Sequence, residues 1–152
     1  MFPIGSYDRL FYDVIDNRYS DYDVVTFGIL IADPRQTEAR EYILNYLQVF
    51  HNASGELFDF YLPGYSSVQY GDLESFGITI DRTEYYFGKR LFLEFLQELN
   101  RNFGIQYTFN PMLILMSMKP GHLNTVEFIV TPDLSYASIK IFILLFAIKY
   151  MS

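Results

Sequence analysis

The feature that most constrains the fold is a near-continuous apolar run, Asp23–Ala32, which leads directly into a helix-start pattern. A run of β-branched and large apolar residues predicts a strand buried on both faces, within a sheet that helices cover on each side. Asp33 then has the side chain of an N-cap, Pro34 suits the first helical position, and Gln36 completes a capping box. We therefore expect a buried strand followed by an amphipathic helix over residues 34–51.

A second strand and an irregular segment follow this helix. Leu57–Leu62 is short and aromatic and is followed by Pro63-Gly64, which predicts a strand ended by a turn. Residues 63–81 contain scattered glycines and acids, and we interpret them as a surface excursion. A short strand at Phe76–Ile80 is the alternative reading of the end of this segment.

A second helix is predicted after the excursion. Asp81 and Glu84 repeat the capping-box spacing, and the apolar stripe that follows predicts a helix over Arg82–Phe103. Gly88 lies within that range, so the alternative is a helix that begins only at about Gly88.

The last third of the chain carries two strand patterns and an ambiguous apolar segment. Asn110-Pro111 opens the apolar run Met112–Met118, and the turn residues 119–121 connect it to the alternating run Val126–Val130, which predicts an antiparallel hairpin. The segment Ile139–Tyr150 is apolar at a length at which periodicity does not separate a helix from a strand.

We expect one domain over residues 1–152, because a chain of this length is typical of a single domain with one core. Residues 1–22 form an N-terminal extension, in which apolar residues at helical spacing after Ser6 predict a short leading helix. Residues 23–150 form the core, with the excursion 63–81 inserted in it.

The order of these elements, together with a proline at the start of the third core strand, resembles the thioredoxin-like fold. The resemblance implies an α/β sandwich in which helices flank a four-stranded mixed sheet in the order fourth, third, first, second; here an extra N-terminal helix is added. It also implies that Pro111, at a position that is usually cis in this family, faces the start of the helix at Pro34. The turn 33–36 would then adjoin Asn110-Pro111.

The chain contains no cysteine, which excludes disulfides and thiol redox chemistry. The positions at which the thioredoxin-like family usually carries its two redox cysteines read Asp-Pro-Arg-Gln, residues 33–36. An enzyme of another kind stays open but is less expected than a binding protein. The candidate ligand-binding residues are those at the expected corner, Asp33, Arg35, Gln36, Asn110 and Pro111. Capping is the competing explanation for Asp33 with Gln36, and for Asp81 with Glu84.

The charge and the motifs of the chain argue against nucleic acid, a metal ion, a cofactor and a membrane as partners. The formal net charge of −7 repels phosphate backbones, so no nucleic acid is expected. The two histidines, His51 and His122, lie at the end of one predicted helix and in a predicted hairpin turn, so no metal site is expected. The glycines lack the spacing of a phosphate-binding loop, so no cofactor is expected either. The apolar stretch Ile141–Ile148 is far shorter than the roughly 20 residues of a spanning helix. The N-terminal sequence has no signal-peptide pattern, so the expected location is cytoplasmic.

These observations favour a non-catalytic protein-interaction or assembly module. We expect a homodimer that buries part of the apolar segment Ile139–Tyr150, and tyrosines outside the core stripes suit a protein interface. One alternative is a small-ligand-binding protein or enzyme that uses the Asp33–Gln36 and Pro111 corner. Another is an acidic inhibitor or immunity-type protein that blocks a basic partner.

Overall fold

The structure is a computed structural model that describes residues 2–44, 47–54, 59–67, 73–132 and 134. The segment Ile139–Tyr150, and with it the choice between helix and strand, lies outside these residues. Among the helices that are described, none is long and apolar enough to cross a bilayer.

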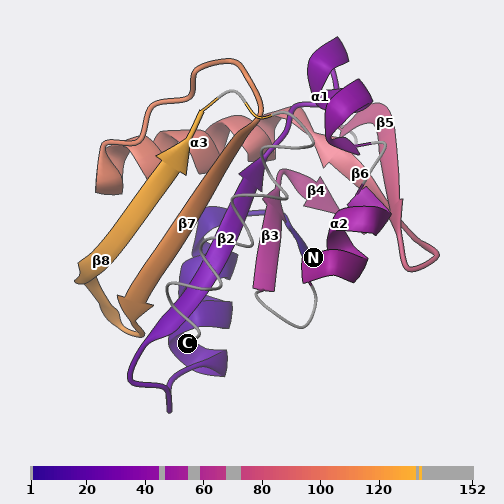
Figure 1. Ribbon diagram of the computed structural model, residues 1–152. Coiled ribbons are helices and arrows are strands. Elements are labelled where there is room, and N and C mark those ends of the chain that lie inside the picture. The colour runs from indigo at the N-terminus through magenta and orange to yellow at the C-terminus, as the bar shows by residue number, and fades with distance from the viewer. Residues whose placement is uncertain (1, 45–46, 55–58, 68–72, 133, 135–152) are drawn as a thin grey trace.

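A five-stranded mixed sheet forms the centre of the molecule (Figure 1). Its middle strand, β2 (Val25–Ile31), pairs in parallel with β3 (Asp59–Pro63) and antiparallel with β7 (Met112–Lys119). At one edge β8 (His122–Thr131) pairs antiparallel with β7, and at the other β1 (Phe2–Ile4) pairs in parallel with β3. The strand order is β1-β3-β2-β7-β8.

The expected α/β fold with a mixed sheet is confirmed, and the sheet is larger than expected. The four expected strands lie in the order β8, β7, β2, β3, which is the predicted order of fourth, third, first, second. The sheet has five strands rather than four, because β1 within the predicted N-terminal extension also pairs with β3. Three residues are too few for a period-2 pattern to be recognised, so β1 could not be predicted from residue spacing.

A second, three-stranded sheet replaces the predicted surface excursion. It consists of β4 (Tyr65–Ser66), β6 (Thr83–Gly88) and β5 (Leu73–Ile80) in that order, so the alternative of a strand ending at Ile80 is confirmed. Asp81 and Arg82 form the turn between β5 and β6, with φ angles of 50° and 68°. Two successive positive φ angles are typical of the hairpin turn whose twist matches that of the strands.

The capping-box interpretation of Asp81 and Glu84 is therefore wrong. Both residues belong to the β5–β6 hairpin, and the helix α3 (Lys89–Phe103) begins only after Gly88, as the alternative proposed. Gly104 ends this helix in the left-handed conformation, with a φ angle of 68°. The side chain of Asp81 instead binds Gln48 and His51 across the chain, at 2.9 and 2.6 Å.

The single helix predicted over residues 34–51 is also wrong. Two short helices occupy this region, α1 (Thr37–Tyr42) and α2 (Leu47–Ser54). Gln36 is extended, with φ and ψ of −90° and 129°, and neither its side chain nor that of Asp33 caps α1. The side chains of both residues have other partners, which are described below.

The predicted leading helix is present, and its winding is unusual. It is the π-helix η1 (Arg9–Arg18), preceded by Ser6, whose hydroxyl accepts a hydrogen bond from the Arg9 amide at 3.2 Å. A π-helix of ten residues is rare, and such segments occur frequently at functional sites.

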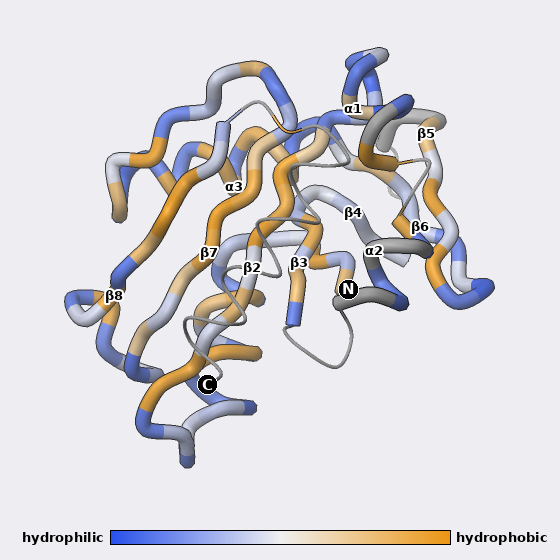
Figure 2. The backbone as a smooth tube through the Cα atoms, in the orientation of Figure 1, coloured by the Kyte–Doolittle hydropathy of each residue, from blue (hydrophilic) through white to orange (hydrophobic). Residues whose placement is uncertain are grey.

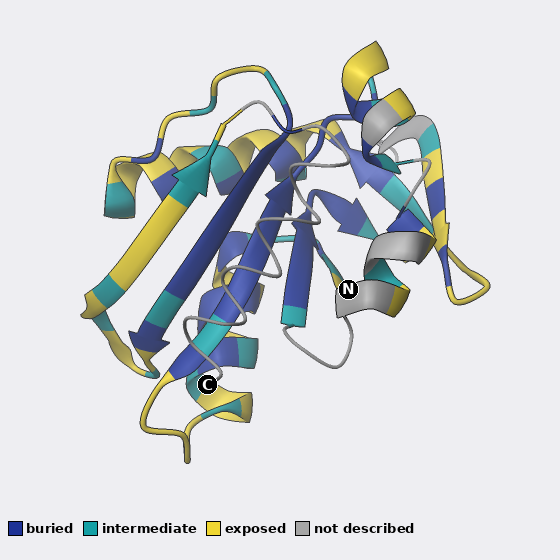
Figure 3. Cartoon of the chain, in the orientation of Figure 1, coloured by how far each residue is buried: buried dark blue, intermediate teal, exposed yellow. Residues whose placement is uncertain are grey.

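The helices η1 and α3 lie behind the five-stranded sheet in Figure 1, and an aromatic cluster joins them to it. Phe11 of η1 lies 6.0 Å from Phe27 of β2, and Tyr7 lies 4.4 Å from Phe11 and 5.9 Å from Phe95 of α3, between ring centres. The strands β2, β3 and β7 are apolar and buried, whereas much of β8 is exposed (Figures 2 and 3).

Candidate functional site

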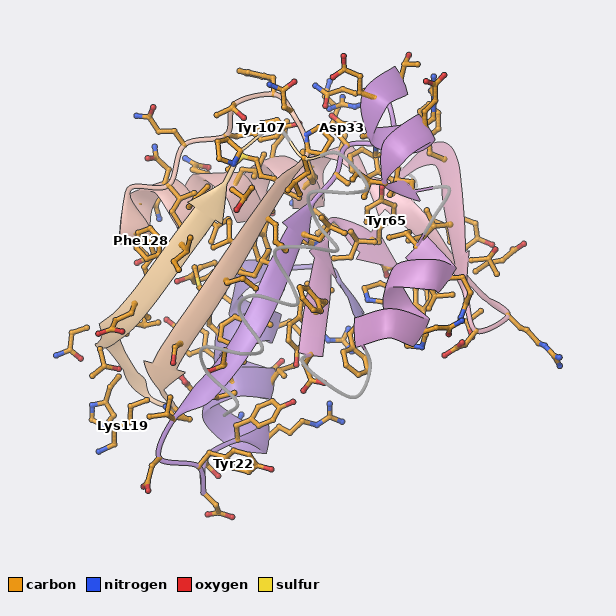
Figure 4. All side chains as sticks on the ribbon, in the orientation of Figure 1. Tyr22, Asp33, Tyr65, Tyr107, Lys119 and Phe128 are labelled. Atoms are coloured by element: carbon orange, nitrogen blue, oxygen red, sulfur yellow. The ribbon has the colours of Figure 1, made fainter. Side chains whose placement is uncertain are left out.

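The predicted meeting of the segment after β2 with the start of β7 is confirmed. Ile31, the last residue of β2, pairs with Met112, the first residue of β7, so the loops that flank them leave the sheet side by side. The side-chain amide of Gln36 donates to the Phe109 carbonyl, and the Tyr107 hydroxyl donates to Gln36 Oε1 at 3.3 Å. We call the residues 33–36 together with 107–111 the corner; Figure 4 shows Asp33 and Tyr107 close together there.

Asp33 is the buried charge of the corner. It is 5% exposed and forms an ion pair with Arg35, whose Nη2 lies 2.6 Å from Asp33 Oδ2 and whose Nε lies 2.9 Å from Oδ1. The Arg35 backbone amide also donates to Asp33 Oδ1 at 2.9 Å. The carboxylate therefore closes a turn and holds its own guanidinium, instead of capping a helix.

Two tyrosines, Tyr65 and Tyr107, lie near this carboxylate, and its negative charge helps to raise their pKa values. The Tyr65 hydroxyl donates to the Ala32 carbonyl at 3.1 Å, and burial, followed by the charge of Asp33, raises the Tyr65 pKa well above its usual value. Burial and then Asp33 raise the pKa of Tyr107 to about 12. Both phenols are therefore neutral at physiological pH and cannot serve as bases there.

The polar groups of the corner are mostly bonded to one another. Asp33 binds Arg35, both ends of the Gln36 amide are engaged, and the Pro111 carbonyl accepts the Leu134 amide at 3.0 Å. Asn110 is half-buried and Pro111 is buried. The helix that follows, α1, has only six residues, so it offers no extended N-terminal dipole for an anion.

The Asn110–Pro111 peptide bond is trans, which differs from the usual state at the position that the resemblance assigns to Pro111. The corner thus shares the expected placement of its residues but not this detail of geometry.

The corner also contains a strongly exposed aromatic residue, Phe109, which was not among the predicted site residues. Phe109 is 73% exposed and has a φ angle of 63°, which is rare for a bulky residue and costs about 1–3 kcal/mol. Its ring lies 5.1 Å from that of Tyr107, and its carbonyl is held by Gln36. In the sequence, this exposed ring was indicated only by the position of an aromatic residue immediately before Asn110-Pro111.

A titration from about pH 10 upward should reveal the tyrosines whose pKa is raised by folding, with Tyr65 and Tyr107 among them. A tyrosine whose pKa is raised by folding stabilises the protein fully below its unfolded pKa of about 10, and this stabilisation is lost as the pH rises through the folded value. We expect the free energy of unfolding to fall between about pH 10 and 12. Denaturant unfolding at a series of pH values, with tyrosinate absorbance recorded in parallel, measures this fall.

Tyr107→Phe should make the fall with pH shallower, because the variant lacks one of the shifted groups. Tyr12→Phe is the control, since Tyr12 is 50% exposed. An unchanged slope in Tyr107→Phe would show that the environment of this hydroxyl is not the one described.

Neither histidine belongs to the corner. His51 lies on α2 and binds Asp81, and the bonds from Gln48 and His51 lower the Asp81 pKa. His122 begins β8. Among the residues that the structure describes, no group of three or more His, Asp and Glu side chains is placed to hold a metal ion.

Two clefts beside η1 were not predicted. The η1–β1 cleft, of about 580 Å³, is lined by residues of both elements and by Tyr61 of β3. The η1–α3 cleft, of about 410 Å³, is lined by Tyr7 and Asp8 on one side and by Glu94, Glu98 and Arg101 on the other. Neither cleft could be predicted from local residue patterns, because each is lined by segments that are distant along the chain.

Comparison with known proteins adds no relative: no family model matches the chain, and no curated protein or solved structure is significantly similar to it.

Proposed function

We propose that the protein is a non-catalytic protein-interaction module of thioredoxin-like architecture, which binds a protein partner through the corner. The strand order β8-β7-β2-β3 supports the architecture, because it is the order that the resemblance implies. The absence of cysteine and the internal bonding of Asp33 and Gln36 support binding over catalysis.

The observation that carries the proposal is Phe109. The Phe109 ring is 73% exposed, so its burial contributes little to the stability of the core. Its backbone nevertheless has an unfavourable positive φ angle, and the Phe109 carbonyl accepts a hydrogen bond from Gln36. Unfavourable backbone conformations concentrate at binding and switching segments, and large aromatic side chains supply much of the energy of protein interfaces. A role in binding explains both the exposure and the conformation.

Phe109→Gly should separate binding from stability. Glycine accepts a φ angle of 63° without strain, so the variant should be as stable as the parent protein or more stable by about 1 kcal/mol. It should lose a protein partner that the parent protein retains in an affinity capture analysed by mass spectrometry. The measurement is the ratio of captured partner between the two proteins, with unfolding curves for each.

Tyr22→Ala is the matched control for this experiment. Tyr22 is an exposed aromatic residue, 57% exposed, at the opposite end of the sheet from Tyr107 (Figure 4). It should leave the capture of the partner unchanged. Equal capture by Phe109→Gly and by the parent protein would reject the corner as the contact surface.

The acidic-inhibitor alternative has one specific observation in its favour. Asp8, Glu94 and Glu98 line the η1–α3 cleft, and Arg101 is the basic residue among its lining side chains. Such a cleft suits a Lys or Arg side chain of a basic partner. Binding of a basic partner that weakens strongly with salt and with Glu98→Gln, but not with Phe109→Gly, would favour this alternative.

Self-association through Ile139–Tyr150 stays a prediction, since that segment lies outside the described residues. A small ligand or substrate at the corner is the other alternative. The pairing of Asp33 with Arg35, and the bonds of the Gln36 side chain to Phe109 and Tyr107, argue against it.

A further inference from the structure

The η1–β1 cleft contains a combination of groups that neither the corner nor the proposed interaction uses. Its lining includes two arginines, one acid, two apolar side chains and a tyrosine, namely Arg9, Arg18, Asp13, Phe2, Val14 and Tyr61. The arginines and Asp13 lie on the exposed side of η1, whereas Tyr61 is only 2% exposed and belongs to the sheet behind it. The cleft thus has a charged rim and a wall that includes the buried side chain of Tyr61.

The π-helical winding of η1 brings the two arginines to the same cleft. Nine residues make two and a half turns of an α-helix, so Arg9 and Arg18 would lie on opposite sides of one. In a π-helix each turn takes slightly more than four residues, so the same nine residues make about two turns. The unusual winding therefore has a direct consequence: it places both guanidinium groups on one face, together with Asp13.

Neither guanidinium has a partner within the described part of the chain. No hydrogen bond or ion pair joins the side chain of Arg9 or Arg18 to another described residue, whereas Arg35, Arg90 and Arg101 each form one. In a protein with a net charge of −7, two such arginines beside a single acid form a locally positive site.

The Tyr61 hydroxyl is a second, independent sign of a missing partner. It is buried without a hydrogen bond, which leaves a polar group desolvated at a cost. The Tyr19 hydroxyl lies close enough to contribute to the raised Tyr61 pKa, but no hydrogen bond of acceptable geometry joins the two hydroxyls, and Tyr19 donates its own hydrogen bond to Asp59. Because burial raises the pKa of Tyr61, its hydroxyl keeps its proton at neutral pH and is available as a donor.

We propose that the η1–β1 cleft binds a small organic monoanion, a carboxylate attached to an apolar body. Among the residues that line the cleft, Arg9, Arg18 and Asp13 leave one net positive charge, and the nearby Asp59 carboxylate, which accepts the hydrogen bond of the Tyr19 hydroxyl, further disfavours a dianion. Guanidinium groups bind carboxylates through paired hydrogen bonds, and the Tyr61 hydroxyl adds a donor at the buried end. Phe2, which is 42% exposed, and Val14 provide apolar surface for the body of the ligand.

Calorimetric titration of the full chain with phenylacetate, hexanoate and 4-phenylbutyrate tests this site. At least one of these acids should bind saturably and raise the unfolding temperature. Its methyl ester, which lacks the charge, and inorganic phosphate should each bind at least tenfold more weakly. Tighter binding of phosphate than of every carboxylate, or of the ester than of its acid, would overturn the proposal, as would no binding of any acid.

Paired variants locate the binding. Tyr61→Phe should weaken the carboxylate about tenfold while unfolding at the same or a higher temperature without ligand. Tyr7→Phe is its control, since the Tyr7 hydroxyl is likewise buried without a hydrogen bond but lines the η1–α3 cleft; this variant should keep full affinity.

Arg18→Ala and Arg9→Gln should each abolish or strongly reduce binding. Arg82→Gly removes the same charge from the β5–β6 turn, at a φ angle that suits glycine, and should leave the affinity unchanged. Affinity that survives in both Arg9→Gln and Arg18→Ala, or that falls equally in Tyr7→Phe and Tyr61→Phe, would place the ligand elsewhere and reject this site.

Discussion

Gly28→Val is expected to lower the free energy of unfolding by about 3 kcal/mol or more. Gly28 lies in the middle of β2 and pairs with Phe60 of β3. A Cβ atom at this position would lie 2.3 Å from the Phe60 ring, and that ring is fully packed, with 2% of the residue exposed. The ring has no solvent into which it can move, so the sheet must distort. Chemical denaturation of both proteins measures the difference.

A glycine with ordinary space provides the control. In Gly5→Ala the new Cβ would lie 3.8 Å from Leu91, which is a normal contact, so this variant should remain within about 1 kcal/mol of the parent protein. Exchange of Phe60 for leucine in the Gly28→Val background should restore part of the stability by removing the clash. A Gly28→Val protein as stable as the parent would contradict the β2–β3 pairing.

Arg35→Ala is expected to cost about 3 kcal/mol, because it leaves the buried carboxylate of Asp33 without its guanidinium. The carboxylate accepts three side-chain contacts from Arg35 within 3.1 Å, and only 5% of Asp33 is exposed. The remaining bond from the Arg35 backbone amide cannot replace the lost charge. Denaturant unfolding at neutral pH measures the loss.

The double variant Asp33→Asn with Arg35→Ala should be more stable than Arg35→Ala alone, because it removes the uncompensated charge. Arg40→Ala is the control for the loss of an arginine nearby, since Arg40 donates hydrogen bonds to the neutral Pro34 carbonyl and Thr37 hydroxyl and lies over the Phe76 ring, with no ion pair to a described residue. If the double variant is less stable than Arg35→Ala, the ion pair is not the source of the loss.

The four central strands were individually predictable because their signals are local and strong. The apolar run of β2, the aromatic run of β3 and the apolar run of β7 each mark a strand buried in the core. Turn residues between β7 and β8 fix an antiparallel hairpin, and a helix crossover fixes β2 parallel to β3. These rules give the β7–β8 and β2–β3 pairs. The placement of β7 beside β2 was expected only from the resemblance to the thioredoxin-like fold, and β1 depends on pairing that no local pattern encodes.

The two capping-box predictions failed for the same physical reason. An acid followed three residues later by Glu or Gln satisfies the donors of a helix start, but an acid is also favoured in a turn. Asp81 occupies a hairpin turn, and Asp33 folds back on the Arg35 amide and guanidinium. Gln36 finds its partner at Phe109, on a loop that only the tertiary fold brings near.

The sequence therefore predicted which two segments meet at the candidate site, but it did not predict the contacts between their side chains. The expected neighbours, the turn after β2 and the residues before β7, do meet. The exposed ring of Phe109 and the two clefts beside η1 depend on backbone conformation, a positive φ angle and π-helical winding, which residue spacing does not specify.

Cross-linking across the corner most directly tests the central claim that residues 33–36 lie beside residues 107–111. Because the chain contains no cysteine, only the introduced cysteines can react. A variant with Gln36→Cys and Phe109→Cys should form an intramolecular cross-link with a short bismaleimide, detected by the mass of the joined peptides. Gln36→Cys with His122→Cys should not, because His122 lies at the other end of β7, a strand of eight residues that spans about 25 Å. Efficient cross-linking of the second pair, or none of the first, would contradict the proposed corner.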